Sequence, residues 1–379
     1  MKKNVFLLVC LCCVFTFPQC SDSDLIDGEI FNNNVVPVEP FNYSSVAFIA
    51  RITENSGDWS LCTIDKLGNN MRKIVDMTVD CKKPVRSNSG TKLLFTAVNF
   101  DYWTDENYIF HSSSEYELYI VNTDGTGLTL IDRIDKTEHD FFRGVAWSPD
   151  DSQIVYVRSY DDSLDKTRLI IYNISNNTRT VLQTEGNVCQ PHFSPDGTKI
   201  AYCSSTETGH DIFIMDVYGN KNQLIISNGS APKWSPRGDK IVYITSGKDR
   251  SSQISVANAD GTGQKQLTTT VSPKWWDTGF PRGGNYDPQW TPDGKKIVYV
   301  SEENDSMEIM ITNADGSKKT RLRKTLYKDT DPEVTPDGKY ILHSSTHTEF
   351  MNDGIYVMKL DGNSRKEITK TGNYPVACK

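Results

Sequence analysis

Short apolar runs separated by polar turns recur along the chain at intervals of roughly forty residues. The run KIAYCSS (199–205) follows the tetrapeptide SPDG (194–197) and precedes a second apolar run, DIFIMDV (211–217). Runs of β-branched and aromatic residues bounded by Gly, Pro, Asp and Ser are typical of β-strands joined by tight turns. A unit repeated at this interval indicates a propeller or a solenoid.

Each unit divides into four predicted strands. In the copy that begins at Pro191, the segment PHF leads into the SPDG turn, and KIAYCSS, DIFIMDV and KNQLIIS (221–227) follow with polar turns between them. Four antiparallel strands make one blade. Blades packed face to face bury both surfaces of each sheet, which explains apolar runs that lack strict alternation. The pattern therefore predicts an all-β propeller of four-stranded antiparallel blades.

The two repeated turns predict the number of blades. The turn after the first strand begins at residues 87, 148, 194, 235, 291 and 335. The turn before the fourth strand occurs at Gly68, Gly125, Asn176, Gly219, Gly261, Gly316 and Gly362. Residues 46–76 contain three strands without a first one, and GNYPVACK (372–379) is similar to GNYDPQW (284–290), which begins a unit. We predict a seven-bladed propeller whose N- and C-terminal strands share one blade; six blades is the alternative if residues 43–80 pack irregularly.

The N-terminal segment is predicted to direct export. Lys2 and Lys3 precede an apolar run at residues 5–17, as in a secretory signal, and this run is shorter than the about 20 residues of a membrane-spanning helix. Cys20 closes the run and is followed by acidic residues. This arrangement resembles lipoprotein signals of the Bacteroides group, in which that Cys becomes the lipidated first residue. The alternative is an ordinary cleaved signal in which Cys20 is incidental.

These features predict three segments: a signal peptide at 1–19, a lipidated N-terminus and tether at 20–42, and a β-propeller at 43–379. The lipoprotein resemblance implies an outer membrane protein on the periplasmic side or the cell surface, held to the membrane by its lipid alone. Loss of Lys2 and Lys3 with the signal lowers the formal net charge from −8 to −10. An acidic surface repels phosphate backbones, so we expect no nucleic acid partner.

The cysteines left after signal cleavage do not have the spacing of a metal site or of a disulfide framework. Cys189 and Cys203 flank the SPDG turn, so they are predicted to lie nearly opposite each other on paired strands. We expect two buried thiols; a disulfide, which the periplasm would allow, is the alternative.

The repeat itself carries a family resemblance. The pattern P-x-[WF]-[ST]-P-D-G-x-x-I-x-[YF], followed by segments such as QISVANADGTGQKQLT (253–268), resembles the TolB-type propeller repeat over nearly the whole chain after the tether. The resemblance implies the fold and leaves the activity open, because similar propellers serve as binding platforms, as accessory domains of peptidases and as oligogalacturonate lyases.

Catalytic signatures are missing from the sequence. It contains no G-x-S-x-G, H-E-x-x-H or G-x-G-x-x-G motif, and the Asp of SPDG recurs at one turn position, which indicates turn chemistry. A metal-dependent lyase would need several ligands that converge on one face. The low-priority metal candidates are four histidines expected in loops on one face: His111, His139, His210 and His347. We predict no catalytic residues, no metal and no cofactor.

The binding site is predicted from the lengths of the loops. Long insertions at 99–116, 158–168, 270–287 and 345–354 all fall in second-to-third-strand loops or blade connections, which share one face of a propeller. The candidate ligand-binding residues on them are Tyr102, Trp103, Trp275, Trp276, Phe280, Arg282 and Tyr286. Aromatic rings stack on sugars and peptide side chains, and Arg282 could pair with a carboxylate. The alternative is that the aromatics cover the blade edges as a lid.

The sequence thus favours a non-catalytic, lipid-anchored propeller that binds a glycan, a peptide or an envelope protein partner on the face bearing the long loops. The alternative function is a metal-dependent, carbohydrate-active enzyme of the propeller lyase type.

Overall fold

The computed structural model describes residues 43–378, apart from 44, 51–58, 76, 78–83, 105–109, 138–141, 160–166, 185, 208, 248–250, 270–282, 304–305, 324–327 and 348–351. The chain divides into two units, Met1–Pro40 and Phe41–Lys379, and every described strand belongs to the second. None of the described residues forms a helix long and apolar enough to cross a membrane.

The described strands form five sheets of four strands and one of eight, which confirms the predicted all-β fold. In order across each sheet, the first three four-stranded sheets are β28 (Asn373–Cys378), β1 (Ser45–Ala50), β2 (Ser60–Asp65) and β3 (Arg72–Lys73); β4 (Val85–Arg86), β5 (Lys92–Thr104), β6 (Phe110–Asn122) and β7 (Thr129–Thr137); and β8 (Val145–Trp147), β9 (Gln153–Ser159), β10 (Thr167–Asn173) and β11 (Thr178–Val181).

The other two four-stranded sheets are β12 (Val188–Phe193), β13 (Lys199–Thr206), β14 (Gly209–Asp216) and β15 (Gln223–Ile226); and β24 (Lys328–Val334), β25 (Tyr340–His347), β26 (Asn352–Lys359) and β27 (Lys366–Thr369). The eight-stranded sheet contains β16 (Gly229–Trp234), β17 (Lys240–Ser246), β18 (Ser252–Asn258), β19 (Lys265–Gln266), β20 (Gly284–Trp290), β21 (Lys296–Glu303), β22 (Ser306–Asn313) and β23 (Thr320–Arg321). Its two runs of four strands are joined by a single parallel pair, Ser252 with Gly284.

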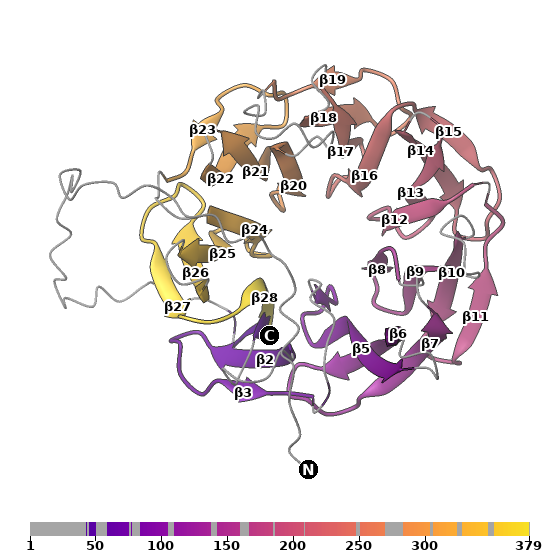
Figure 1. The fold of residues 1–379 in the computed structure, drawn as a ribbon. Helices are drawn as coiled ribbons and strands as arrows, with labels where there is room; N and C mark the ends of the chain where they lie inside the picture. Colours follow the sequence, from indigo (N-terminus) through magenta and orange to yellow (C-terminus); the bar gives the residue numbers. More distant parts are fainter. Residues whose placement is uncertain are drawn as a thin grey trace, which may run out of the picture. The chain divides into compact units, whose positions relative to one another are not determined.

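The sheets stand around a common centre (Figure 1). We call the first strand of each set of four the inner strand, because it lies nearest this centre; the inner strands are β28, β4, β8, β12, β16, β20 and β24. The last strand of each set lies at the outside. β28 pairs antiparallel with β1, with Val46 opposite Ala377. The C-terminal strand therefore joins the sheet that the N-terminal strands begin.

The core lies between neighbouring sheets. Leu94 and Leu118 of the β4–β7 sheet pack with Tyr156 and Ile170 of the next one, and equivalent layers recur around the ring. Five consecutive residues of β13, from Ile200 to Ser204, are buried. Strands with a covered sheet on each face bury successive side chains, so the apolar runs of the sequence need not alternate.

The turns after β8, β12, β20 and β24 are each held by an Asp at the same position. In the copy at 194–197, Ser194 Oγ donates to Asp196 Oδ1 (2.5 Å), and the backbone N–H of Thr198 donates to the same oxygen (3.0 Å). These hydrogen bonds, that from Ser194 first, lower the pKa of Asp196. Gly197 has φ +70°, which favours glycine. The repeated Asp is therefore a structural turn residue.

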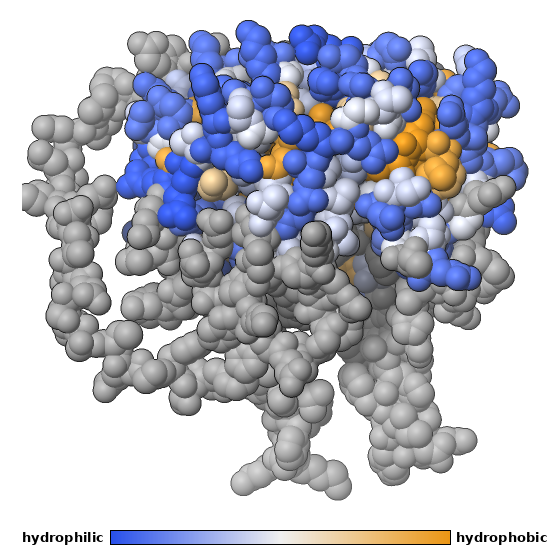
Figure 2. All heavy atoms as spheres, turned by 90° about the horizontal axis from the view of Figure 1, so that it is seen from above, coloured by the Kyte–Doolittle hydropathy of each residue, from blue (hydrophilic) through white to orange (hydrophobic). Residues whose placement is uncertain are grey.

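Solvent-exposed large apolar side chains are few among the described residues. Those on outer strands are Leu130, Val181 and Leu224, each less than half exposed. Figure 2, turned by 90° from Figure 1, shows a largely hydrophilic surface broken by separate apolar areas. Single exposed apolar side chains of this kind are normal on protein surfaces.

Candidate functional site

Six of the residues singled out from the sequence lie outside the described part of the chain. They are Cys20, His139, Trp275, Trp276, Phe280 and Arg282. The roles assigned to them therefore stay predictions.

All four predicted long loops are partly strand, and the insertion at 99–116 is the clearest case. Residues 99–104 and 110–116 continue β5 and β6, and the backbone register pairs Tyr102 with Ser112 and Trp103 with His111. The expectation of a loop over 99–116 is wrong for these residues, because the antiparallel ladder continues outward and pairs their backbone groups. The hairpin thus brings three candidates, Tyr102, Trp103 and His111, to neighbouring positions of its backbone.

The candidate histidines lie on separate sheets. His111 is on β6, His347 ends β25, and His210 is an exposed residue of β14. Within the described residues, no group of three or more His, Cys, Asp or Glu side chains could hold a metal ion.

Tyr286 belongs to an inner strand and not to an insertion. The predicted insertion at 270–287 ends before Gly284, where β20 begins. Tyr286 is half-buried there, and burial, followed by the carboxylates of Glu302, Asp331 and Asp287, raises the pKa of its phenol. Tyr286 therefore remains protonated at neutral pH and stands in an acidic part of the wall.

A backbone feature repeated in the inner strands shapes this wall. The residue before the strand's Pro has φ between +48° and +58° in five copies: Gln190, Ala231, Asp287, Asp331 and Tyr374. The pairing register shifts at each of these bulges. Left-handed backbone at non-glycine residues is uncommon and tends to cluster at functional sites. The bulges therefore make the inner strands candidates for the functional site.

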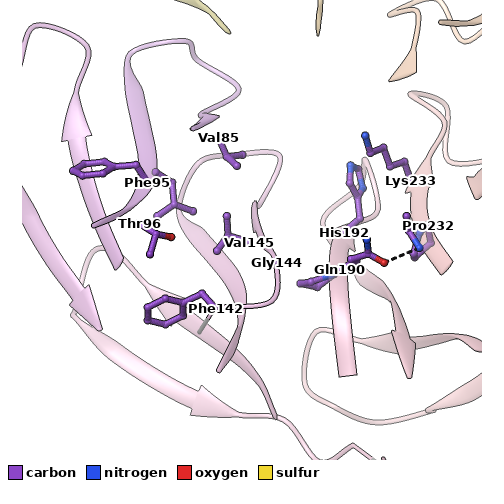
Figure 3. Close-up of a pocket in the computed structure, with 13 residues that line it drawn as sticks. Val85, Phe95, Thr96, Phe142, Gly144, Val145, Gln190, His192, Pro232 and Lys233 are labelled. Atoms are coloured by element: carbon purple, nitrogen blue, oxygen red, sulfur yellow. Dashed lines mark hydrogen bonds between the residues drawn. The ribbon is translucent and has the colours of Figure 1, made fainter. Parts of the chain in front are cut away.

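A pocket of about 390 Å³ is lined by residues of four neighbouring sets, most of them on or next to the inner strands. It is lined by Val85, Leu94, Phe95, Thr96, Phe142, Gly144, Val145, Gln190, Pro191, His192, Ala231, Pro232 and Lys233. Figure 3 shows Val85, Phe95, Phe142 and Val145 on one side and Gln190, His192 and Lys233 on the other. We call this the central pocket. One of its sides is apolar, and the other carries hydrogen-bonding groups.

The polar side is fixed by contacts between neighbouring inner strands. Gln190 Oε1 accepts a hydrogen bond from the backbone N–H of Ala231 (3.0 Å), and Lys233 Nζ lies 3.2 Å from Asp287 Oδ1. Both partners of this ion pair are partly exposed, at 28% and 30%, so the pair itself adds little stability. Its consequence is to hold the Lys233 ammonium group in place.

His192 is neutral at physiological pH. Burial, and then the charge of Lys233, lowers its pKa to about 4. Its Nδ1 lies 2.9 Å from the carbonyl oxygen of Phe193. Because a carbonyl only accepts, Nδ1 carries the proton, and Nε2 presents a lone pair.

A disulfide adjoins the polar side. Cys189 and Cys203 are direct cross-strand partners with a Cα–Cα distance of 5.2 Å, and they are bonded. The expectation of two buried thiols is therefore wrong, since this spacing lies within the range that disulfides use. The bond ties β12 to β13 directly beside Gln190.

A ring of four-stranded antiparallel sheets with a pocket among its inner strands defines a β-propeller. A family model described as the TolB beta propeller domain matches residues 96–279 and 277–379. The chain belongs to this family.

Known relatives agree with this assignment. A protein described as a TolB homolog from Chlorobium luteolum is 32% identical over 133 residues, which are 35% of this chain and 27% of that protein. The aligned segments span between 12% and 36% of the length of the first curated relatives that the chain matches.

Solved structures resemble the fold. TolB from Acinetobacter baumannii has a TM-score of 0.51 at 16% identity, covering 87% of this chain and 81% of that one. An oligogalacturonate lyase in complex with manganese has a TM-score of 0.56 at 13% identity, covering 86% of each chain. At these identities the likeness establishes the fold alone.

Proposed function

We propose that the protein is a non-catalytic, lipid-anchored propeller that binds a glycan, a peptide or an envelope protein partner on the face bearing the long loops. The observation that carries the proposal is the central pocket, whose lining combines an apolar side with a few fixed polar groups. Ligand sites in proteins have this composition and are usually concave and preformed.

The lining residues support the choice of face. Phe142, Gly144, Gln190 and Ala231 stand at or near the starts of their inner strands. Each inner strand except β28 starts from a blade connection and ends at the first repeated turn. Blade connections share a face with the second-to-third-strand loops, where the insertions of the sequence fall. A ligand in the pocket would therefore be approached from the side of Trp275 and Trp276.

We propose seven blades for this ring. The two halves of the eight-stranded sheet each contain four strands in the order of the other sheets, and among the described residues a single backbone pair, Ser252 with Gly284, joins them. Counting the halves separately gives seven sets of four. Treating the eight strands as one blade gives the alternative of six.

We also propose that residues 1–19 are removed as a signal peptide, that residues 20–42 form a tether lipidated at Cys20, and that the propeller occupies 43–379. The protein would then be an outer membrane lipoprotein on the periplasmic side or the cell surface. Replacing Cys20 with Ser should release it from the membrane fraction. Undiminished membrane association of the Cys20→Ser protein would refute the anchor.

Binding on the proposed face is tested with the mature protein on glycan and peptide arrays that include acidic oligosaccharides. Trp275→Ala and Trp276→Ala should weaken a hit by about 1–3 kcal/mol if a ring stacks on the ligand. Tyr218→Ala is the matched control, because Tyr218 is 81% exposed in the β14–β15 turn on the other face. A hit that Tyr218→Ala weakens and the tryptophan variants do not would contradict the proposed face.

The alternative, a metal-dependent lyase, is suggested by the fold likeness to the manganese-bound oligogalacturonate lyase. It predicts a stoichiometric divalent ion in the purified protein and unsaturated products from acidic oligosaccharides. Finding both would replace the non-catalytic proposal.

A further inference from the structure

The central pocket carries a positive charge and no negative one among its described lining residues. Among the described residues that line it, Lys233 is the one with a formal charge, and none is a carboxylate. Asp287, which pairs with Lys233, belongs to β20, outside that lining. A group bound against the polar side therefore meets an ammonium donor first, and this favours an anionic acceptor such as a carboxylate.

Two further polar groups stand beside Lys233. The Gln190 oxygen is engaged by Ala231, and no described residue accepts a hydrogen bond from the Gln190 amide nitrogen, so its N–H groups are available to a second acceptor atom. His192 Nε2 has no partner among the described residues and presents a lone pair. The polar side thus offers two donor groups for a carboxylate and one acceptor for a neighbouring N–H or O–H.

The opposite side of the pocket fits an apolar group. Val85 and Val145 lie toward the polar residues across it, whereas the rings of Phe95 and Phe142 point away into the core layers between the sheets (Figure 3). A volume of about 390 Å³ is at the small end of the range of about 300–1,000 Å³ for ligand pockets. It suits one aromatic or branched side chain with its polar end, rather than several sugar rings.

We propose that the central pocket binds an apolar amino-acid unit with a free carboxylate, with the side chain against Val85 and Val145, the carboxylate on Lys233 and Gln190, and the α-N–H on His192 Nε2. The unit is either an N-acyl amino acid or the C-terminal residue of a peptide. This inference rests on the proposed binding function and specifies the ligand chemistry at the same site.

The test is calorimetric titration of the mature protein with three probes. N-acetyl-phenylalanine supplies all three features, N-acetyl-phenylalaninamide lacks the carboxylate, and 3-phenylpropionate lacks the N–H donor. The first should bind about tenfold or more tightly than the amide, because a charged hydrogen-bonded contact is lost. Its margin over 3-phenylpropionate should be smaller. Equal affinities for acid and amide, or no binding of N-acetyl-phenylalanine, would overturn the inference.

Substitutions at Lys233 and Asp287, the two partners of the ion pair, should change the affinity for the acid in opposite directions. Lys233→Gln should abolish the preference for the acid over the amide. Asp287→Asn should strengthen acid binding several-fold, since it removes a competing carboxylate while Asn tolerates the left-handed backbone at that position. A gain of affinity cannot come from misfolding. Lys295→Gln, a change in an exposed turn, is the control and should leave all three titrations unchanged. An acid preference that survives Lys233→Gln would exclude this site.

A further arm distinguishes the two sources. A peptide ending in Ala-Ala-Phe with a free carboxylate should bind at least as well as N-acetyl-phenylalanine if the ligand is a chain end, and much more weakly if it is a free N-acyl amino acid. If no probe binds but array hits depend on Trp275 or Trp276, the inference fails and the proposed function stands. If array hits map to the Tyr218 face, the proposed function fails instead.

Discussion

The turns and the inner strands both recur around the ring, but the turns conserve side-chain contacts from copy to copy, whereas the inner strands conserve a backbone conformation. In the turns the side-chain contacts themselves recur: Ser148 with Asp150, Ser194 with Asp196, Thr291 with Asp293 and Thr335 with Asp337. In five of the inner strands the backbone bulge recurs, but the side chain after its Pro does not. The residue after the Pro changes from copy to copy, as His192, Lys233, Gln289 and Glu333. The turns therefore fix the architecture, and this leaves positions on the inner strands free to differ in chemistry.

The largest expected effect comes from a turn glycine that touches the neighbouring sheet. Gly261 has φ +83°, and a Cβ there would lie 2.2 Å from the carbonyl oxygen of Ile225. Gly197 has a similar φ of +70°, but its Cβ would meet Pro149 at an ordinary 3.5 Å. Ala at either position lowers the free energy of unfolding by about 1–2 kcal/mol because of the left-handed backbone. Overpacking lowers it by about 1–3 kcal/mol more in Gly261→Ala.

We therefore expect Gly261→Ala to lower the free energy of unfolding by about 3 kcal/mol or more and Gly197→Ala by about 1 kcal/mol. Urea unfolding of the two variants measures the difference. Equal losses would mean that the contact between the Gly261 turn and β15 yields easily, so that the turns do not fix the spacing of the sheets.

The repeat explains which features the sequence could predict. Strand pairing, the turn aspartates and the joining of β28 to β1 each follow from residues that recur. The structure of one copy of the repeat can therefore be inferred from the others. The central pocket does not follow in this way. Its polar groups occupy a position that the repeat leaves variable, and nothing in the sequence sets the distance between neighbouring inner strands. The variation itself, with His192 and Lys233 in adjacent copies, was the available signal.

One buried strand position also departs from its repeat. Tyr156, Tyr202, Tyr243 and Tyr299 occupy equivalent places in their second strands and are almost fully buried. The β24–β27 sheet has His343 there, with no exposed surface. His343 stacks on Tyr356, its Nδ1 lies 3.1 Å from the carbonyl oxygen of Ser344, and Nε2 accepts a long hydrogen bond from Arg365 Nε (3.4 Å). A titratable ring thus replaces a neutral phenol in the core.

This replacement should make stability depend on pH. Burial is the main cause that lowers the pKa of His343 to about 4, from 6.5. Between these values the unfolded chain binds a proton that the folded chain does not, so stability falls as the pH drops below about 6.5 and stops falling near pH 4. The contribution is about 3 kcal/mol. His192 adds a smaller term of the same sign because it is half-buried.

His343→Tyr, which introduces the residue found at this position in four other sets of strands, measures the effect. The slope of unfolding free energy against pH between 4 and 6.5 should become shallower, whatever the variant does to stability at pH 7. An unchanged slope would show that His343 is protonated in the folded state and is paired with Asp329, which lies 3.7 Å from Nδ1.

The smallest expected effect compares two tryptophans at equivalent positions of the inner strands. Trp147 Nε1 donates to the carbonyl oxygen of Val85 (2.9 Å), on the inner strand of the preceding sheet, and Trp290 donates likewise to Lys233 (3.1 Å). Trp234 is as buried as Trp147, but its Nε1 has no hydrogen-bond partner among the described residues. Phe at either site removes the same atoms, so the two losses of packing should be similar.

Trp147→Phe also leaves the Val85 carbonyl without its donor, whereas Trp234→Phe removes an N–H that is already costly to bury. Chemical unfolding should therefore find Trp147→Phe less stable than Trp234→Phe by about 1 kcal/mol. The opposite order would mean that Trp234 makes a hydrogen bond in solution, and that the link between neighbouring inner strands repeats as faithfully as the turns do.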